Sequence, residues 1–156
     1  MKSWRNQIIS KGEEMSKKDT NPKDSIGATK ADLSLIPASA LVHLSLALTE
    51  GHLKYGAYNW RVAGVRASIY KAASGRHSEK WWNGEDCDKK SLVHHLANEM
   101  ACCAIMLDAI ECGKLIDDRP PSLDMNELFT NAESVTKHLQ REYPSGPGRY
   151  TEANNE

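Results

Sequence analysis

The sequence predicts an all-α fold of about four helices, and three observations support this prediction. In residues 89–112, apolar side chains recur at helical spacing and form a stripe of Leu92, Leu96, Met100, Cys103, Leu107 and Ile110. Residues 37–55 show the same spacing after Pro37, a residue suited to the first turn of a helix. No segment alternates apolar and polar residues in the way that half-buried strands do.

The first two helices are expected on either side of a short loop. The first helix covers residues 37–55 and stops at Gly56, because glycine is common directly after a helix. Residues 59–64 are expected to form the loop. The second helix covers residues 65–83 and ends at Gly84.

The third and fourth helices are predicted with N-terminal caps. Asp88 is the expected N-cap of the third helix, residues 89–112, and the apolar stripe of that helix is its expected core face. Asp124 and Glu127 have the spacing of a capping box, which predicts that a fourth, amphipathic helix starts there.

These patterns divide the chain into four parts. Residues 1–20 are a polar N-terminal extension that we expect to be disordered. Residues 21–116 form the helical domain, and residues 117–142 form a linker followed by the amphipathic helix. Residues 143–156 are a second polar segment that we expect to be disordered.

Charge and composition limit the kinds of function. The chain has 20 basic and 21 acidic residues and a formal net charge of −1, so no cationic excess is available to bind nucleic acid through its phosphates. No apolar run is long enough to span a bilayer, and the N-terminus lacks the apolar segment of a secretion signal. We therefore expect a cytoplasmic protein without a membrane or nucleic-acid partner. The cysteines at 87, 102, 103 and 112 are expected to be reduced and buried.

Residues 50–61 have the composition of a ligand-facing corner at the end of the first helix. They contain one carboxylate, two cations, an amide, three aromatic rings and two glycines: Glu50, Lys54, Arg61, Asn59, Tyr55, Tyr58, Trp60, Gly51 and Gly56. A solvated turn does not need the rings, and glycine in a helix interior costs about 1 kcal/mol relative to alanine. Glu50 and Lys54 are four residues apart, so they are able to pair on one helix face.

Acidic residues in three places predict a divalent metal site. His95 and Glu99 lie one turn apart on the third helix, Glu50 is expected on a neighbouring helix, and an acidic turn precedes the third helix. Oxygen ligands favour Mg²⁺ or Mn²⁺ over zinc. The predicted ligands are Glu50, Glu85, Asp86, His95 and Glu99. The alternative interpretation is that His95 and Glu99 form a satisfied polar pair in the core.

Basic and aromatic side chains near these acids are expected to bind the phosphates and the base of a ligand opposite the metal. Arginine binds phosphate as a bidentate fork and lysine as a point charge, and aromatic rings stack on a base. Each cation taken singly is also compatible with a solvated surface, and Trp60 with core packing. The predicted substrate contacts are Lys54, Tyr55, Asn59, Trp60, Arg61 and Arg76.

Several short motifs together resemble a known family. They are Asn21-Pro-Lys-Asp24, Lys30, Leu53-Lys-Tyr-Gly56, Tyr58-Asn-Trp-Arg-Val-Ala-Gly-Val65, Arg76-His77, Gly84-Glu-Asp86 and His94-His-Leu-Ala97. In this order they resemble the phage dATP/dGTP diphosphohydrolase family, whose members are small, all-helical and MazG-like. The resemblance covers residues 21–113, which is most of the chain.

The resemblance implies the reaction dNTP + H₂O → dNMP + PPi, with dATP or dGTP as substrate and Mg²⁺ or Mn²⁺ as cofactor. Helix-borne carboxylates would hold the metal and activate water, a histidine would orient that water or protonate the leaving group, and Lys54 and Arg61 would stabilise the β and γ phosphates. The catalytic residues so implied are Glu50, His77, His95 and Glu99. The resemblance further implies a phage or prophage protein, a homodimer or homotetramer, that remodels the nucleotide pool of a bacterial host.

Two features keep an alternative open. The common MazG arrangement pairs Glu-x-x-Glu with Glu-x-x-Asp, whereas this chain pairs Glu50 with Lys54 and has Asn98 and Glu99 after His95. A non-catalytic nucleotide-binding or assembly module on the same scaffold would tolerate that departure. A small DNA-associated protein is disfavoured, since the charge is near neutral.

Overall fold

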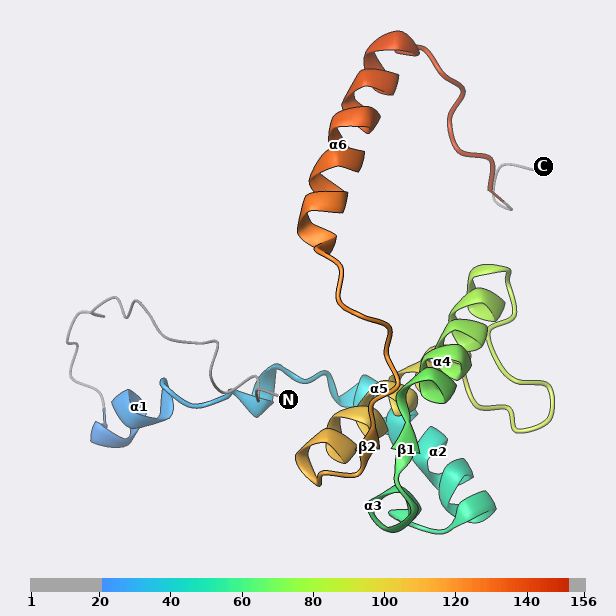
Figure 1. Cartoon of the computed structure of the whole chain (residues 1–156). Helices are drawn as coiled ribbons and strands as arrows, with labels where there is room; N and C mark the ends of the chain where they lie inside the picture. The colour runs from blue at the N-terminus through green and yellow to red at the C-terminus, as the bar shows by residue number, and fades with distance from the viewer. Residues whose placement is uncertain (1–20, 152–156) are drawn as a thin grey trace.

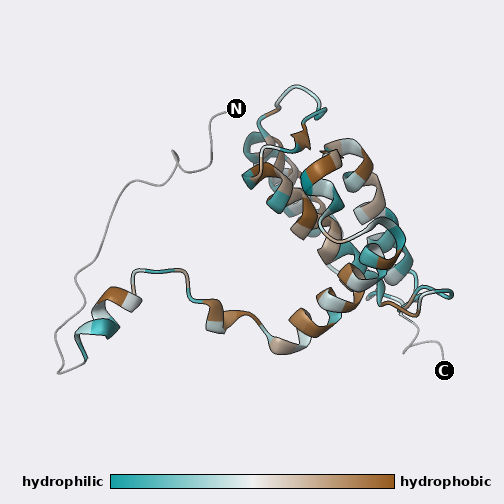
Figure 2. Cartoon of the chain, turned by 90° about the horizontal axis from the view of Figure 1, so that it is seen from below, coloured by the Kyte–Doolittle hydropathy of each residue, from teal (hydrophilic) through white to brown (hydrophobic). Residues whose placement is uncertain are grey.

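The computed structural model describes residues 21–151 and confirms the all-α fold class (Figure 1). Two short elements come first, helix α1 (Pro22–Gly27) and the 3₁₀ helix η2 (Leu33–Leu35). Figure 2 shows apolar residues, in brown, along the arm that carries η2 towards helix α2 (Ala38–Tyr55). Asn21 caps α1 by accepting a hydrogen bond from the backbone N–H of Lys23.

The body of the molecule is built around helix α5 (His95–Glu111), which packs on both α2 and helix α4 (Ala67–Trp82). Where α2 meets α5, the buried cluster consists of Ala47, Val93, Ala97 and Ala101, with Leu44 and Leu48 against it. Three of these buried residues are alanines, and small side chains let helix backbones approach closely. The packing of α2 and of α4 on α5 brings polar side chains of all three helices to one cavity.

A pair of two-residue strands joins the start of α4 to the end of α5. Strand β1 (Val65–Arg66) pairs in parallel with strand β2 (Leu115–Ile116), with Val65 opposite Leu115. Val65 N–H donates to Lys114 O at 3.0 Å. The sequence contained no signal for these strands, because two residues are too few to show an alternation.

The loop predicted for residues 59–64 is wrong, since helix α3 (Asn59–Ala63) occupies it. Gly56, with a φ of 87°, ends α2 as predicted, and Tyr58 precedes α3 in the left-handed region at a φ of 55°. This turn places Asn59 and Trp60 beside the end of α2, and both side chains are half-buried there.

The predicted start of the third helix at residue 89 is also wrong, because α5 begins at His95. Residues 86–94 fold back on themselves, with an antiparallel bridge between Cys87 and His94. The Asp88 carboxylate accepts from the N–H groups of Lys90 and Ser91 within that turn and does not cap α5. His94 is the N-cap instead, its Nδ1 accepting from Leu96 N–H.

The predicted core stripe of the third helix is wrong as well. Leu92 lies in the turn with a φ of 61° and is 76 % exposed, and Leu107 is 65 % exposed. Leu96, Cys103 and Ile110 are exposed too. The buried positions of α5 are His95, Ala97, Ala101 and Ala109. This helix is apolar on two faces, and spacing alone does not tell which of them meets its neighbours.

Helix α6 (Met125–Glu142) follows the linker and stands apart from the body (Figure 1). As predicted, Asp124 is its N-cap and accepts from Asn126 and Glu127 N–H. Its apolar side chains, including Leu128 and Leu139, are exposed. Residues 143–151 are exposed and, apart from a turn at residues 144–145, have no regular secondary structure. The disorder predicted for residues 1–20 lies outside the described residues.

Two further observations concern solvent and membrane. All four cysteines are free, and the prediction that they are buried is wrong for Cys87, Cys103 and Cys112, which are exposed. Within residues 21–151, none of the helices combines the length and the apolar character needed to cross a membrane.

Candidate active site

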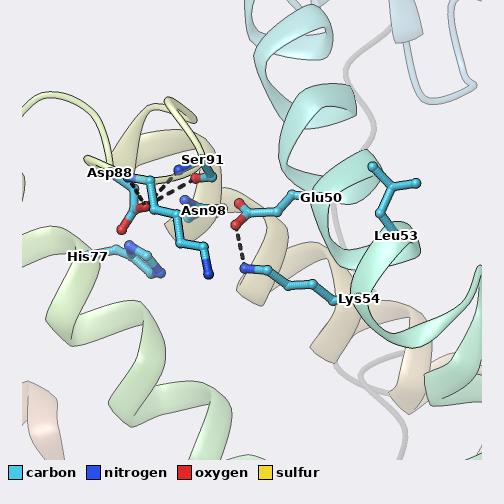
Figure 3. A pocket seen from close by; sticks show the side chains of 8 residues that line it. Glu50, Leu53, Lys54, His77, Asp88, Ser91 and Asn98 are labelled. Atoms are coloured by element: carbon cyan, nitrogen blue, oxygen red, sulfur yellow. Dashed lines mark hydrogen bonds and ion pairs between the residues drawn. The ribbon is translucent and has the colours of Figure 1, made fainter.

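A charged cavity of about 540 Å³ opens between α2, α4, α5 and the 86–94 turn. Glu50 and Lys54 from α2 face His77 of α4 and Asn98 of α5 across it (Figure 3). The turn adds a carboxylate, a cation and a hydroxyl to the same wall. Its lining residues are Glu50, Leu53, Lys54, His77, Asp88, Lys90, Ser91 and Asn98.

A second cavity of about 180 Å³ adjoins the first and is largely aromatic and apolar. Glu50, Lys54, His77 and Asn98 line both cavities, so the two spaces meet at these side chains. The second cavity is lined by the aromatic rings of Tyr55, Trp60 and Tyr70 and by the side-chain amides of Asn59 and Asn98. A charged cavity is thus joined to one lined mainly by aromatic and apolar side chains. Sites for small ligands commonly combine an apolar and aromatic lining with a few polar groups in this way.

Glu50 and Lys54 occupy the last turns of α2 and form an ion pair. Their spacing of four residues places both on one helix face. The hydrogen bond from Lys54 to Glu50 raises the pKa of the Lys54 ammonium, which is therefore charged at neutral pH. The Glu50 side chain is 18 % exposed, so this carboxylate is partly withdrawn from water.

The 86–94 turn holds Asp88 as an ionised carboxylate on the wall of the charged cavity. Lys90 N–H and Ser91 N–H both donate to Asp88 Oδ1 at 3.0 Å. These backbone hydrogen bonds lower the pKa of Asp88 to about 2. The 86–94 turn, which lies where the third helix was predicted to start, is therefore the element that presents Asp88 to the cavity.

A chain of hydrogen bonds leads from the acidic turn to the cavity through two histidines. His95 is fully buried, and its Nε2 lies 3.0 Å from Glu85 Oε1. His95 Nδ1 lies 2.9 Å from His77 Nδ1. Lys80 Nζ lies 3.2 Å from the same oxygen of Glu85. The pKa of Glu85 is lowered mainly by the hydrogen bond from His95 and, to a lesser extent, by that from Lys80. The pKa of His77 is lowered mainly by burial and, to a lesser extent, by the proximity of His95.

Arg61 has a partner on α5 rather than in the cavities. Its Nε and Nη2 donate to the two oxygens of Asp108 at 2.8 and 2.7 Å, and Trp60 Nε1 donates to Asp108 at 2.6 Å. These bonds lower the pKa of Asp108 to about 2 and raise the pKa of Arg61. Arg76 is exposed and lines neither cavity.

The five predicted metal ligands are not brought together as one set. Among residues 21–151, no three His, Cys, Asp or Glu side chains lie close enough to hold a metal ion. Glu85 and His95 bond to each other, and Asp86 is exposed, with its backbone carbonyl accepting from His95 N–H. Glu99 is half-buried and lines neither cavity, whereas Glu50 does.

Two carboxylates on the charged cavity, Glu50 and Asp88, suit a different kind of metal binding. Magnesium in nucleotide sites is often held by one or two carboxylates together with substrate phosphates and water. Two carboxylates are too few to hold such an ion by themselves, so an ion here would need further oxygen ligands from water or from a bound molecule.

Some cavity residues had no signal in the sequence. Lys90, Ser91 and Tyr70 line the cavities, and Asp108 holds Arg61 and Trp60. Each belongs to a stretch whose spacing indicated only a helix. Their placement follows from the turn at Asp88 and from the packing of α4 on α5, which local patterns do not encode.

The family comparison agrees with the motifs of the sequence. A family model described as "dATP/dGTP diphosphohydrolase, N-terminal" matches residues 20–119, a segment that contains both cavities. No curated protein and no solved structure matches the chain. The match covers well over half of the sequence and confirms the resemblance. The chain thus belongs to the dATP/dGTP diphosphohydrolase family, a family of hydrolases that act on nucleotides.

Proposed function

We propose that this chain hydrolyses purine deoxynucleoside triphosphates, dATP or dGTP, to the monophosphate and pyrophosphate in a reaction that depends on Mg²⁺ or Mn²⁺. The observation that supports this most is the junction of a charged cavity with an aromatic one at Glu50, Lys54, His77 and Asn98. A nucleotide has the same division into a charged chain and a flat base.

The triphosphate occupies the charged cavity in this proposal. Lys54 and Lys90 supply positive charge there, and Glu50 and Asp88 would hold the metal together with phosphate oxygens. When bound, the metal neutralises phosphate charge and raises the hydroxide fraction of a coordinated water. Arg61, held by Asp108, and Arg76 line neither cavity, so we assign them no phosphate contact.

The purine base occupies the aromatic cavity. Tyr55, Trp60 and Tyr70 provide ring faces for stacking, which adds roughly 0.5–1.5 kcal/mol per aromatic pair beyond the area buried. Asn59 and Asn98 provide amide donors and acceptors for the edge of the base. Trp60 is held in place by its hydrogen bond to Asp108, so its ring is fixed before the base arrives.

The lack of a three-ligand cluster in residues 21–151 favours one alternative, a non-catalytic nucleotide-binding module. Pyrophosphate release from each of the dNTPs, measured with Mn²⁺ and with EDTA, separates the two functions. We expect turnover of dATP or dGTP that EDTA abolishes. Retained nucleotide binding without any turnover would establish the module instead.

The placement of the phosphates is tested by a matched pair of lysine variants. Lys54→Met removes a cation from both cavities, and Lys71→Met removes an exposed one from α4 that lines neither. A hydrogen bond to a charged group is worth roughly 1.5–3 kcal/mol. We therefore expect Lys54→Met to weaken kcat/KM by about tenfold or more and Lys71→Met to leave it unchanged. Equal effects of the two variants would refute the placement.

We further propose that the protein acts as a homodimer or homotetramer in the bacterial cytoplasm, where it remodels a phage-infected cell's purine pool. Exposed apolar side chains on α5, including Leu96, Leu107 and Ile110, support the oligomer. Such a surface is typical of an interface between subunits.

A further inference from the structure

We propose that Glu85 and His95 form a hydrogen-bond relay that holds His77 in one tautomer, with Nε2 bare and available to accept a proton in the charged cavity. The inference deepens the proposed function, on which its catalytic part rests. It assigns Glu85 and His95 as positioning residues rather than metal ligands. The tautomer itself is a property of the free protein, so it is testable without substrate.

The direction of the relay starts at Glu85. An ionised carboxylate only accepts hydrogen bonds, so His95 Nε2, 3.0 Å from Glu85 Oε1, must donate. Lys80 Nζ lies 3.2 Å from the same oxygen and already supplies a cation to that carboxylate. A second hydrogen on His95 would place a positive charge on a ring that is fully buried, next to a carboxylate that Lys80 already neutralises. His95 is therefore treated as neutral in the relay.

The second step follows from the two ring nitrogens of a neutral imidazole. When His95 Nε2 carries the hydrogen, its Nδ1 is bare and accepts. His77 Nδ1 lies 2.9 Å from this atom and must therefore be the donor. A neutral His77 with hydrogen on Nδ1 has none on Nε2. Glu85 thereby determines, through His95, which ring nitrogen of His77 carries the hydrogen.

The ring of His77 lines both cavities. Because its Nδ1 is occupied by His95, Nε2 is the ring nitrogen left for a molecule in the cavity. Glu50, Lys54, Asp88 and Lys90 are the charged groups that line the same space. A water molecule between His77 and the phosphates would thus face a bare nitrogen with no competing proton.

The chemical step balances without any further reagent. As the water oxygen forms a bond to the α-phosphorus, one O–H bond breaks and its proton passes to His77 Nε2. The bond between the α-phosphorus and the oxygen of the leaving pyrophosphate breaks, and that oxygen keeps the electron pair. The imidazolium formed on His77 is stabilised because its Nδ1–H points to His95, which is linked to the anionic Glu85. His77 then returns the proton to solvent.

The first experiment determines the tautomer in the wild-type protein. Nitrogen-15 chemical shifts distinguish ring nitrogens that bear hydrogen from those that do not, and His77→Gln identifies the His77 signals among the six histidines. At neutral pH and without nucleotide, we expect hydrogen on Nδ1 and a bare Nε2. Hydrogen on Nε2 would overturn the relay, whatever the enzymatic activity.

The second experiment compares two Glu-to-Gln variants. In Glu85→Gln the amide is able to donate as well as accept, so the direction of the relay is no longer imposed. Glu79→Gln makes the same change on exposed α4 surface outside the relay. We expect Glu85→Gln to yield a mixture of His77 tautomers and Glu79→Gln to keep the wild-type state.

Turnover gives an independent readout. General base catalysis contributes roughly 10²–10⁴-fold, so His77→Gln is expected to lower kcat by about a hundredfold or more. Glu85→Gln is expected to lower kcat by about tenfold while KM stays near the wild-type value. An unchanged kcat in His77→Gln would refute the catalytic part of the proposal. A wild-type protein without turnover would refute the proposed function, while the nitrogen-15 measurement would still decide the relay.

Discussion

Among the glycines of residues 21–151, Gly64 is the one where an added methyl group would make the closest contact. It precedes β1 and has a φ of 77° and a ψ of 169°, a backbone conformation that residues other than glycine rarely adopt. A Cβ atom there would lie 2.9 Å from the backbone oxygen of Lys114. That oxygen accepts the hydrogen bond from Val65 N–H at 3.0 Å, beside the β1–β2 pair. Gly64→Ala thus acts on the contact that joins the start of α4 to the end of α5.

The expected loss of stability follows from three contributions. This backbone conformation, used almost only by glycine, costs an alanine about 1–3 kcal/mol. Moving Lys114 away weakens a hydrogen bond worth about 0.5–1.5 kcal/mol. Alanine also restricts the unfolded chain, which returns about 0.4–1 kcal/mol. The net expectation is that Gly64→Ala lowers the free energy of unfolding by about 2 kcal/mol.

Urea unfolding followed by circular dichroism measures this change. The control is Gly75→Ala within α4, where an added Cβ meets nothing within 4 Å and the helix gains about 0.5–1 kcal/mol. Both variants and the wild type are measured at one protein concentration, since association would shift the apparent stability. A Gly64→Ala variant as stable as the wild type would refute the close approach of Gly64 to Lys114.

Two further predictions concern pH and association. The pKa of Asp108, lowered from 3.8 to about 2 by Arg61, means that the folded state binds this proton less readily than the unfolded state. Its stabilising effect is complete above about pH 4 and is lost as the pH falls towards 2, so Asp108→Asn should flatten the acid limb of the free energy of unfolding; an unchanged limb would contradict this. For association, Leu107→Glu on α5 should lower the mass measured by light scattering, whereas Leu123→Glu, at a linker position with similar exposure (69 % against 65 %), should not. A mass unchanged in both variants would show that this face of α5 is not the interface.

Local sequence signals correctly predicted those helix ends that are marked by a glycine or by a capping side chain. Gly56 ends α2 and Asp124 caps α6, as their positions indicated. The same logic failed at Asp88, because its carboxylate bonds to Lys90 and Ser91 N–H in a turn. A capping side chain binds nearby N–H groups in either structure, so the residue type does not tell a helix start from a tight turn.

The candidate site was predictable to the same extent. Glu50 and Lys54 pair as their spacing predicted. Arg61 was expected near phosphate, but it is bonded to Asp108, 47 residues further along the chain. No local pattern links two such positions. The connection between His77 and His95 likewise depends on how α4 packs against α5.

The family, the helical class and the presence of a charged and aromatic corner at residues 50–61 were determined by the sequence alone, because they depend on residue types at short spacing. Which face of α5 is buried, which acids reach the cavity and which cations line it were decided by tertiary structure. The physical reason is that these properties depend on the approach of whole helices. The alanines of α5 lie in the core where larger apolar side chains were expected, and the helices that they bring together place His77, Asp88 and Asn98 opposite Glu50.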